Sequence, residues 1–266
     1  MSAFNNMRFV VTGAASGIGR AAASLLKERG AHIIALDLKE PDGFVIDDYI
    51  AYDQGDLESV VQAAARIPEH IDGLLNIAGA PPSPGLNPED LLMINFYGLR
   101  SLTTHLNAKF SPGAAVINMS SHAGHRWREN VNILNNFSEA ESLNDVGKLA
   151  RRYEIVMDGL GDRSAYPLSK QLLNYWTVVS FPECEKFGLR MNAVSAAGVQ
   201  TPILNDFLTS FGEESAARIR SIGVAPAHAI AQSLVFLVSE QSAWIKGAII
   251  PVDSGALALA TLKSLG

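Results

Sequence analysis

A glycine-rich turn near the start of the chain restricts its fold more than any other feature. The stretch Thr12-Gly13-Ala14-Ala15-Ser16-Gly17-Ile18-Gly19 follows a short apolar run at 7–12. Residues 18–29 then carry apolar side chains at helical spacing, and Gly30 is a typical helix end. The pattern predicts a buried strand that turns on glycine into a helix, which is the start of a β-α-β unit.

The same alternation of apolar runs and helix-periodic segments continues along the chain. Further strands are expected at 32–36, 73–78, 114–119, 189–194 and 248–252. Further helices are expected at 57–66, 91–110, 167–187 and 227–238. The strand segments are almost wholly apolar, as in a parallel sheet covered on both faces. We therefore expect one α/β domain over 1–266, with a doubly wound parallel sheet of about seven strands.

Composition and charge limit the kinds of partner. The 266 residues are 48% hydrophobic and 18% charged, which is enough for a sizeable core. The net charge of −6 disfavours a nucleic-acid partner, whose phosphates require clustered Lys and Arg. Without an apolar run of eighteen residues or a signal-like start, the chain is expected to be soluble and cytoplasmic, with no membrane span. The single cysteine, Cys184, excludes an internal disulfide and is expected in the core.

The glycine turn also indicates a ligand. A helix that begins directly after such a turn presents free backbone N–H groups and the positive end of its dipole, which favour a pyrophosphate. Gly13 permits the tight turn, while Gly17 and Gly19 allow the phosphates to approach and the helix to pack on the sheet. The turn therefore predicts a dinucleotide site.

Asp37 closes the second expected strand, eighteen residues after Gly19. A carboxylate at this place accepts hydrogen bonds from the adenosine ribose hydroxyls and repels a 2′-phosphate. No Lys or Arg lies between Thr12 and Gly19 to offset the repulsion, although Lys39 is close in sequence. The chain is therefore expected to bind NAD in preference to NADP; the alternative is a solvated acid after a strand.

Tyr166 and Lys170 are four residues apart, so on a helix their side chains share one face. A free phenol loses its proton near pH ~10, and an adjacent ammonium favours the phenolate and lowers that pKa. Such a phenol can exchange a proton with an alcohol or a carbonyl. The same spacing also occurs in pairs of surface residues. It indicates a catalytic pair here because it follows the glycine turn and several β-α units along the chain.

These motifs, taken in order, resemble one known family. The glycine turn, the run Asn76-Ile77-Ala78-Gly79, the pair Ser120-Ser121 after a strand and Tyr166-x3-Lys170 look like the short-chain dehydrogenase/reductase family. The resemblance covers nearly the whole chain. It implies a Rossmann-type fold, a homodimer or homotetramer, and an NAD-dependent oxidoreductase that interconverts an alcohol and a carbonyl.

The resemblance implies a role for each matching residue. Tyr166 would be the acid/base, and Lys170 would depress its pKa and hold the nicotinamide ribose. Ser121 would orient the reacting oxygen. Asn95 would hold a water that relays protons. Contacts to the cofactor are implied for Gly13, Ser16, Gly17, Ile18, Gly19, Asp37, Asp56, Leu57, Asn76, Ala78, Gly79, Tyr166, Lys170, Val199 and Thr201.

An insertion precedes the tyrosine. Ser121 and Tyr166 are 45 positions apart, far more than the family commonly has, which places the extra residues within 122–164. Apolar residues recur there at helical spacing, with Ser138 and Glu141 as a capping box: Phe137, Ala140, Leu143, Val146, Leu149, Ala150, Tyr153, Val156 and Met157. We expect the insertion to wall the substrate pocket or alter a subunit contact; the alternative is a helix packed on the surface.

The segment 201–222 follows the carboxyl end of a strand, where ligands of open α/β sheets bind. It carries an apolar stripe that includes Phe207 and Phe211, in the place where the family has a lid over the substrate. With Trp127 in the insertion, this stripe predicts an apolar or aromatic small-molecule substrate.

Two further questions concern metal and substrate. His122 and His125 lie three apart but have no suitable third ligand nearby, so no metal is expected.

Within the family, the run 201–207 and the stretches 72–79 and 249–253 resemble bacterial coniferyl alcohol dehydrogenases. Bacterial 3α-hydroxysteroid dehydrogenase/carbonyl reductases share a comparable insertion and are the alternative. A non-catalytic NAD-sensing regulator is a further alternative, which the complete catalytic set disfavours.

Overall fold

The computed structural model describes residues 3–43 and 46–265, and a seven-stranded parallel sheet forms its centre. The strand order is β3-β2-β1-β4-β5-β6-β9, which confirms the doubly wound sheet. The strands are β1 (Arg8–Thr12), β2 (His32–Asp37), β3 (Asp48–Ala51), β4 (Ile71–Asn76), β5 (Phe110–Ser121), β6 (Arg190–Ala196) and β9 (Ile249–Val252).

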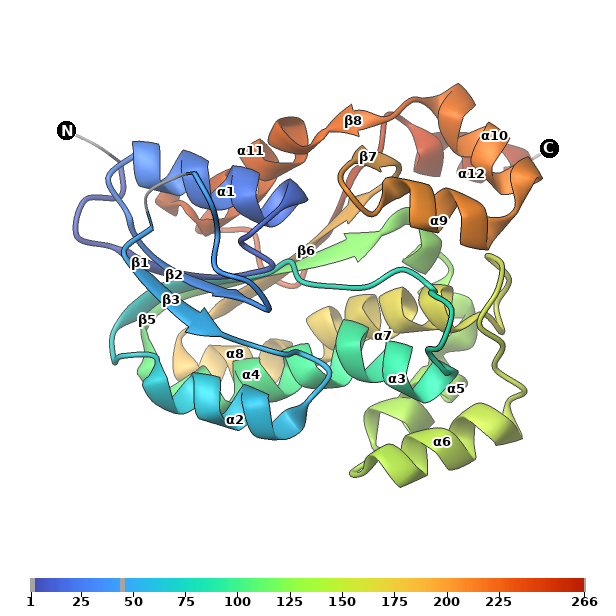
Figure 1. The fold of residues 1–266 in the computed structure, drawn as a ribbon, viewed down its shortest axis with the longest axis horizontal. Helices are drawn as coiled ribbons and strands as arrows, with labels where there is room; N and C mark the ends of the chain where they lie inside the picture. Colours follow the sequence, from blue (N-terminus) through green and yellow to red (C-terminus); the bar gives the residue numbers. More distant parts are fainter. Residues whose placement is uncertain (1–2, 44–45, 266) are drawn as a thin grey trace.

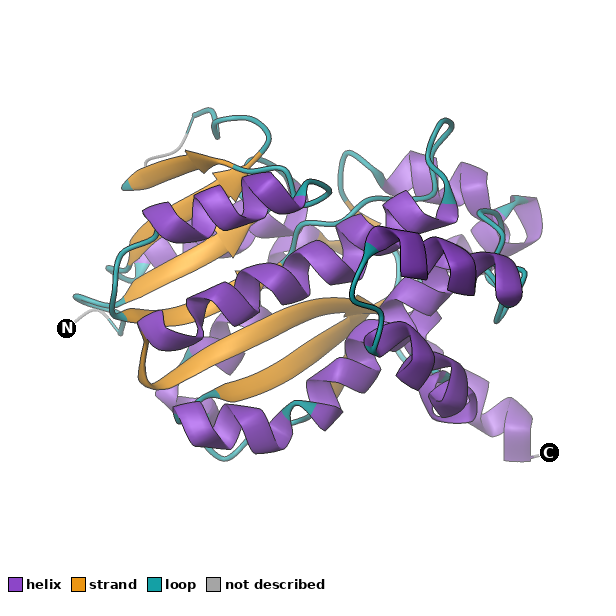
Figure 2. Cartoon of the chain, turned by 90° about the horizontal axis from the view of Figure 1, so that it is seen from below, coloured by secondary structure: helices purple, strands orange, loops and turns teal. Residues whose placement is uncertain are grey.

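Helices cover both faces of the sheet, since the strands are buried on both sides (Figure 1). One face packs against α1 (Gly17–Glu28) and α11 (Ala227–Val238), whose buried residues share a core with the strands. The other face carries α2 (Leu57–Arg66), α4 (Gly98–Leu106), α7 (Ala165–Val179) and α8 (Phe181–Phe187). Figure 2 shows helices of this second face lying across the sheet.

The chain reverses its direction of travel across the sheet between β1 and β4. It passes outward from β1 to β2 and β3, then returns to pair β4 with the opposite side of β1, so that Val10 lies between Ile34 and Leu74. Open α/β sheets bind ligands at such a switch point, beyond the carboxyl ends of the strands.

Two expected helices are each divided. The segment 91–110 begins earlier, with α3 (Pro88–Leu92) capped by Asn87, and passes through a π-helical turn (Met93–Tyr97) into α4. The segment 167–187 forms α7 and α8, because Pro182 supplies no N–H to continue α7. The short strand β3 was not expected, because its burial is too incomplete to produce an apolar run.

The insertion forms two helices, so the expectation of one continuous helix is wrong. They are α5 (Val131–Ser138) and α6 (Leu143–Arg152). The predicted capping box at Ser138 and Glu141 is also wrong: Ser138 ends α5, and Ser142 caps α6 by accepting from the backbone N–H of Asp145. The apolar spacing continues across the break because both helices bury one face in the same cluster.

The segments after β6 contain the remaining short strands and helices. α9 (Leu204–Phe211) and α10 (Glu213–Ile222) lie between two short paired strands, β7 (Val199–Gln200) and β8 (Ala225–Pro226), and α12 (Ala256–Leu265) follows β9. Short 3₁₀ turns occur at Asn107–Lys109, His122–Gly124, Trp127–Asn130 and Glu240–Ser242. In the described ranges, no helix has the length and apolar character needed to cross a bilayer.

Candidate active site

A cavity of about 480 Å³ lies beyond the carboxyl ends of the strands, at the switch point. That volume is in the usual range for small-molecule sites. Its walls come from the glycine turn, the ends of β2, β4, β5 and β6, helix α7 and the segment with α9 and α10. The structure places these predicted site residues on its wall: Gly13, Ser16, Gly17, Ile18, Gly19, Asp37, Ala78, Gly79, Ser121, Tyr166, Lys170, Val199, Thr201, Phe207 and Phe211.

The glycine turn packs so closely against its neighbours that side chains would not fit there. Gly13 has a φ of +68°, and a Cβ there would lie 3.0 Å from the Cα of Ala78. A Cβ on Gly19 would lie 2.1 Å from the carbonyl oxygen of Gly13. The N-cap Ser16 makes no capping bond with its side chain, which leaves the first N–H groups of α1 available to an anion. These observations fit the pyrophosphate of a dinucleotide.

Asp37 lies at the end of β2 beside this turn. Its Oδ2 accepts from the backbone N–H of Ala15 at 2.9 Å, and its Oδ1 accepts from the backbone N–H of Lys39 at 3.3 Å. These bonds hold the carboxylate on the cavity wall. Its remaining acceptor positions suit ribose hydroxyls.

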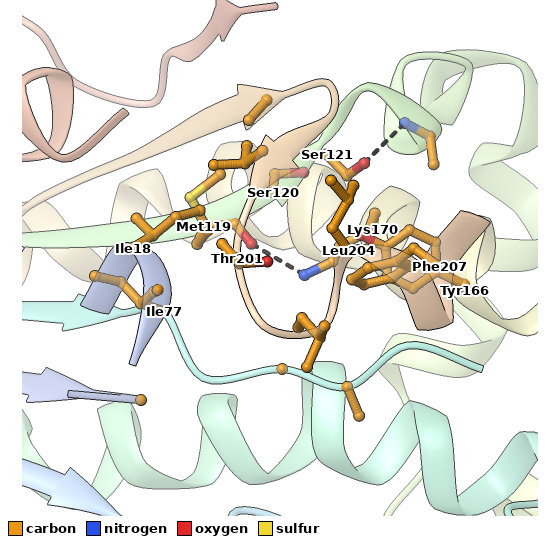
Figure 3. A pocket seen from close by; sticks show the side chains of 18 of the residues that line it. Ile18, Ile77, Met119, Ser120, Ser121, Tyr166, Lys170, Thr201, Leu204 and Phe207 are labelled. Carbon is orange, nitrogen blue, oxygen red and sulfur yellow. Dashed lines mark hydrogen bonds between the residues drawn. The ribbon is translucent and has the colours of Figure 1, made fainter. Parts of the chain in front are cut away.

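The catalytic candidates meet on the opposite wall (Figure 3). Tyr166 and Lys170 lie one turn apart on α7, with Lys170 Nζ 5.7 Å from the centre of the phenol ring. Lys170 Nζ donates to the carbonyl oxygen of Met119 at 3.0 Å. Ser121, at the end of β5, lies close enough to Tyr166 to lower the pKa of its phenol, and its Oγ accepts from the backbone N–H of Ala123 at 3.2 Å. Three groups that can move or stabilise a proton are therefore in one place.

Burial changes the acidity of this pair. It raises the pKa of Tyr166 to about 12, with the hydrogen bond from Ser121 acting in the opposite direction. Burial also lowers the pKa of Lys170 to about 8. The expected lowering of the tyrosine pKa is wrong for this structure, because burial removes the phenolate from water and raises the pKa.

Asn95 lies in the π-helical turn and is buried rather than on the cavity wall. Its Oδ1 accepts from the backbone N–H of Ala80 at 2.8 Å, and its Nδ2 donates to the carbonyl oxygen of Ala80 at 3.0 Å. Nδ2 also lies 3.4 Å from the hydroxyl of Ser169 on α7. Asn95 therefore joins the loop after β4 to the catalytic helix, and its water-holding role remains a prediction.

Three predicted cofactor contacts lie away from the cavity. Asn76 is fully buried and donates to Thr103 and Asn118, so it supports the strand rather than the ligand. Asp56 caps α2 by accepting from the N–H of Glu58, and Leu57 begins that helix, so the expected adenine contact is misplaced.

Asp53 and Gln54 occupy the place expected of Asp56 and Leu57. Both line the cavity just after β3, and Gln54 Nε2 donates to the carbonyl oxygens of Ala78 and Ile94. Sequence reasoning missed these residues because it missed β3. Counting onward from the end of that strand would have found them.

Helix α9, in the segment predicted to be a lid, packs two aromatic rings against that of Tyr166. The ring centres of Phe207 and Phe211 are 4.9 Å and 5.5 Å from that of Tyr166. The expectation for Trp127 is wrong: it lies in the buried cluster of the insertion, 6.4 Å from the ring of Tyr175, and does not line the cavity. Aromatic surface at the site therefore comes from the lid.

Both ends of the insertion reach the cavity, although its helices do not. Arg126 and Asp162 line the wall and form an ion pair at 3.0 Å, with Leu160 beside them. The backbone N–H of Gly159 donates to the carbonyl oxygen of Ser210 in α9 at 3.4 Å. The insertion thus walls part of the pocket and contacts the lid.

Known proteins match along the chain. A family profile described as enoyl-(acyl carrier protein) reductase matches residues 13–141 and 152–256. The coniferyl-alcohol dehydrogenase of a Pseudomonas species is 33% identical over 257 residues, covering 94% of this chain and 96% of the relative. The 3-alpha-hydroxysteroid dehydrogenase/carbonyl reductase of Comamonas testosteroni is 25% identical over 255 residues, covering 92% and 95%.

Solved structures share the fold. The 3-alpha-hydroxysteroid dehydrogenase from another Pseudomonas species, complexed with NADH, matches with a TM-score of 0.77 at 22% identity, covering 96% of this chain and 99% of that structure. The residues between the two stretches matched by the family profile, 142–151, fall almost entirely on α6.

Proposed function

Because the chain belongs to the short-chain dehydrogenase/reductase family, we propose that it uses NAD to interconvert an alcohol and a carbonyl on an apolar or aromatic substrate. The family is the one that the sequence motifs indicated, and its members are oxidoreductases acting on CH–OH donors. The observation that carries the proposal is the meeting of Tyr166, Lys170 and Ser121 in the cavity that the glycine turn enters.

The residues present suit a nicotinamide dinucleotide. The glycine turn would hold the pyrophosphate, Asp37 the adenosine ribose, and Val199 and Thr201 the carboxamide end. When bound, NAD supplies the ring that accepts or returns a hydride. The carboxylate of Asp37 supports NAD over NADP, since it would repel a 2′-phosphate.

The chain's own side chains carry the proton. In the oxidative direction the Oη of Tyr166 takes the proton of the substrate hydroxyl, and in the reductive direction it returns that proton to the carbonyl oxygen. Ser121 hydrogen-bonds the reacting oxygen beside Tyr166 and orients it. Positive charge on Lys170, when protonated, stabilises the phenolate. The phenylalanines of α9 exclude water from this centre.

The lid favours aromatic alcohols of the coniferyl type as substrates. Phe207 and Phe211 present ring faces and edges to the space above Tyr166, and aromatic rings pack well against such surfaces. The relative with 33% identity is named for such an alcohol. Hydroxysteroids are the second candidate class, because relatives named for them also match nearly the whole chain.

The test measures NADH formation by near-ultraviolet absorbance with cinnamyl-type alcohols, hydroxysteroids and small secondary alcohols. We expect turnover with at least one apolar class and the highest kcat/KM with cinnamyl-type alcohols. Binding of NAD without turnover of any alcohol, or of the matching carbonyls with NADH, would instead support a non-catalytic NAD-sensing regulator.

A further inference from the structure

Two histidines beside the catalytic serine have no part in the proposed reaction. His122 and His125 lie in and just after the 3₁₀ turn that follows Ser121, and both line the cavity. Their rings are stacked, with centres 4.6 Å apart and planes 6° from parallel. In the described ranges, no group of three His, Cys, Asp or Glu residues is arranged to hold a metal ion, so the pair needs another explanation.

The hydrogen bonds of His125 settle which of its ring nitrogens carries the proton. Its Nδ1 lies 2.8 Å from the carbonyl oxygen of His122. A carbonyl oxygen can only accept, so Nδ1 of His125 is the donor. In the neutral ring, Nε2 is then an acceptor.

The surroundings of His122 lead to the same arrangement. Its Nδ1 is enclosed, has no hydrogen-bond partner, and lies 3.7 Å from Oδ2 of Asp253. The two carboxylate oxygens of Asp253 accept from the backbone N–H groups of Gly255 and Leu257, which fixes the carboxylate in place. A proton on Nδ1 faces this negative charge favourably, which leaves Nε2 of His122 as the acceptor.

Neighbouring charges favour the neutral form of His122. Burial, His125 and the cation of Arg218 all lower its pKa, while Asp253 acts in the opposite direction, and the net shift is downward. When both rings are neutral, with each Nδ1 protonated and facing a protein oxygen, both Nε2 atoms are unprotonated. Such a pair can accept a hydrogen bond from a ligand but cannot donate one.

We propose that the His122–His125 stack is a polar subsite that accepts a hydrogen bond from a phenolic hydroxyl of the substrate. The proposal rests on the proposed function and narrows its substrate class to aromatic alcohols that carry a ring hydroxyl. A phenol suits the site because its ring matches the apolar lid and its O–H is a stronger donor than an aliphatic hydroxyl.

The experiment compares three alcohols of similar shape: 4-hydroxycinnamyl alcohol, cinnamyl alcohol and 4-methoxycinnamyl alcohol. The first can donate from its ring substituent, the second has no substituent, and the third can only accept. For the natural enzyme we expect kcat/KM for the hydroxyl compound to exceed both others by about tenfold, the effect of one hydrogen bond.

Variants assign that preference to the stack. In His122→Phe, the ratio of kcat/KM for the hydroxyl compound to kcat/KM for cinnamyl alcohol should fall to about one. His105→Phe changes an exposed histidine on α4 and should leave the preference intact.

The dissociation constants of 4-hydroxycinnamaldehyde and cinnamaldehyde, measured by calorimetry with NAD+ present so that the aldehydes are not reduced, give a second readout. A preference that is absent in the natural enzyme, or unchanged in His122→Phe, would overturn the subsite. An equal loss for all three alcohols would do the same, since it would place His122 in folding or general catalysis. Failure to turn over any alcohol of the panel contradicts the proposed function instead, and the aldehyde constants then decide the subsite alone.

Discussion

Lys170 is 6% exposed, and its Nζ donates to the carbonyl oxygen of Met119. Burial lowers its pKa from the ordinary 10.5 to about 8. The buried ammonium therefore reduces the free energy of unfolding by an amount that depends on pH. Below about pH 8 both folded and unfolded chains hold the proton, and the folded state bears the full cost. As the pH rises from about 8 toward 10.5, the folded state releases the proton first, so stability from this group increases.

We predict that Lys170→Met removes this pH dependence. Relative to the variant, the natural protein should gain free energy of unfolding, of the order of 3 kcal/mol at most, between about pH 8 and pH 10. Urea unfolding at several pH values measures it. Above pH 10 the raised pKa of Tyr166 acts in the opposite direction, so the comparison ends there. If the difference in free energy of unfolding between the natural protein and the variant does not change over this pH range, the lowered pKa of Lys170 is contradicted.

In the proposed reaction, turnover depends on Tyr166. Tyr166→Phe keeps the ring that packs against Phe207 but removes the hydroxyl, so NAD binding should persist while kcat falls by at least about a thousandfold. Fluorescence titration with NADH and the absorbance assay measure the two quantities. Full activity in this variant would refute the acid/base assignment.

Asp37 should control the choice between NAD and NADP. Asp37→Asn keeps an oxygen that can accept from Ala15 while removing the negative charge, so the preference for NAD should fall by about tenfold or more. Asp37→Ala also releases the N–H of Ala15 and should weaken NAD binding as well. The ratio of kcat/KM for the two cofactors is the measurement, and an unchanged ratio in both variants would exclude Asp37.

At the scale of elements, a buried arginine completes the end of a helix. Arg190, at the start of β6, is 6% exposed and donates to the carbonyl oxygens of Leu237, Ser239 and Ser242. These oxygens lie at and after the carboxyl end of α11, where the helix itself offers no partner. The arginine therefore joins α11 to the sheet.

We predict that Arg190→Leu lowers the free energy of unfolding by about 2 kcal/mol, because it removes the buried charge-assisted hydrogen bonds to the carbonyl oxygens of Leu237, Ser239 and Ser242. Arg66→Leu, which removes an exposed arginine from α2, is the matched control and should change stability by less than about 0.5 kcal/mol. Chemical denaturation measures both. Equal losses of unfolding free energy in the two variants would show that the buried hydrogen bonds of Arg190 do not stabilise the fold.

For the whole molecule, the cavity is shared between the two halves of the sheet. The glycine turn and Asp37 lie on the β1–β2 side, and Ser121 and the α7 residues on the β4–β6 side. A dinucleotide that spans the switch point would therefore hold both halves together. Binding to the folded state alone adds stability in proportion to the logarithm of ligand concentration.

We predict a single cooperative thermal transition, as expected for one domain, that NAD shifts upward. At about a hundredfold excess over its Kd, NAD should add about 2.7 kcal/mol and raise Tm by roughly 5–10 °C. NADP at the same concentration should give a smaller shift. Scanning calorimetry measures both, and two separate transitions of which only one responds to NAD would contradict a single domain.

Local patterns in the sequence were sufficient for several features. The strand-turn-helix at Gly13, the alternation of strands and helices, and the shared face of Tyr166 and Lys170 all follow from backbone chemistry and side-chain period, which act over a few residues. The family motifs added Ser121 and the lid, and the structure places both at the cavity.

Only the tertiary structure decided the features that depend on distant segments. In the insertion, two helices rather than one pack into a common cluster, where Trp127 is also buried. The strand β3, which the sequence patterns did not predict, places Asp53 at the cavity. Desolvation reversed the expected pKa shift of Tyr166. The fold also brought Asp253 beside His122. The physical reason is common to all: burial and charge at a site are sums over neighbours that sequence spacing does not encode.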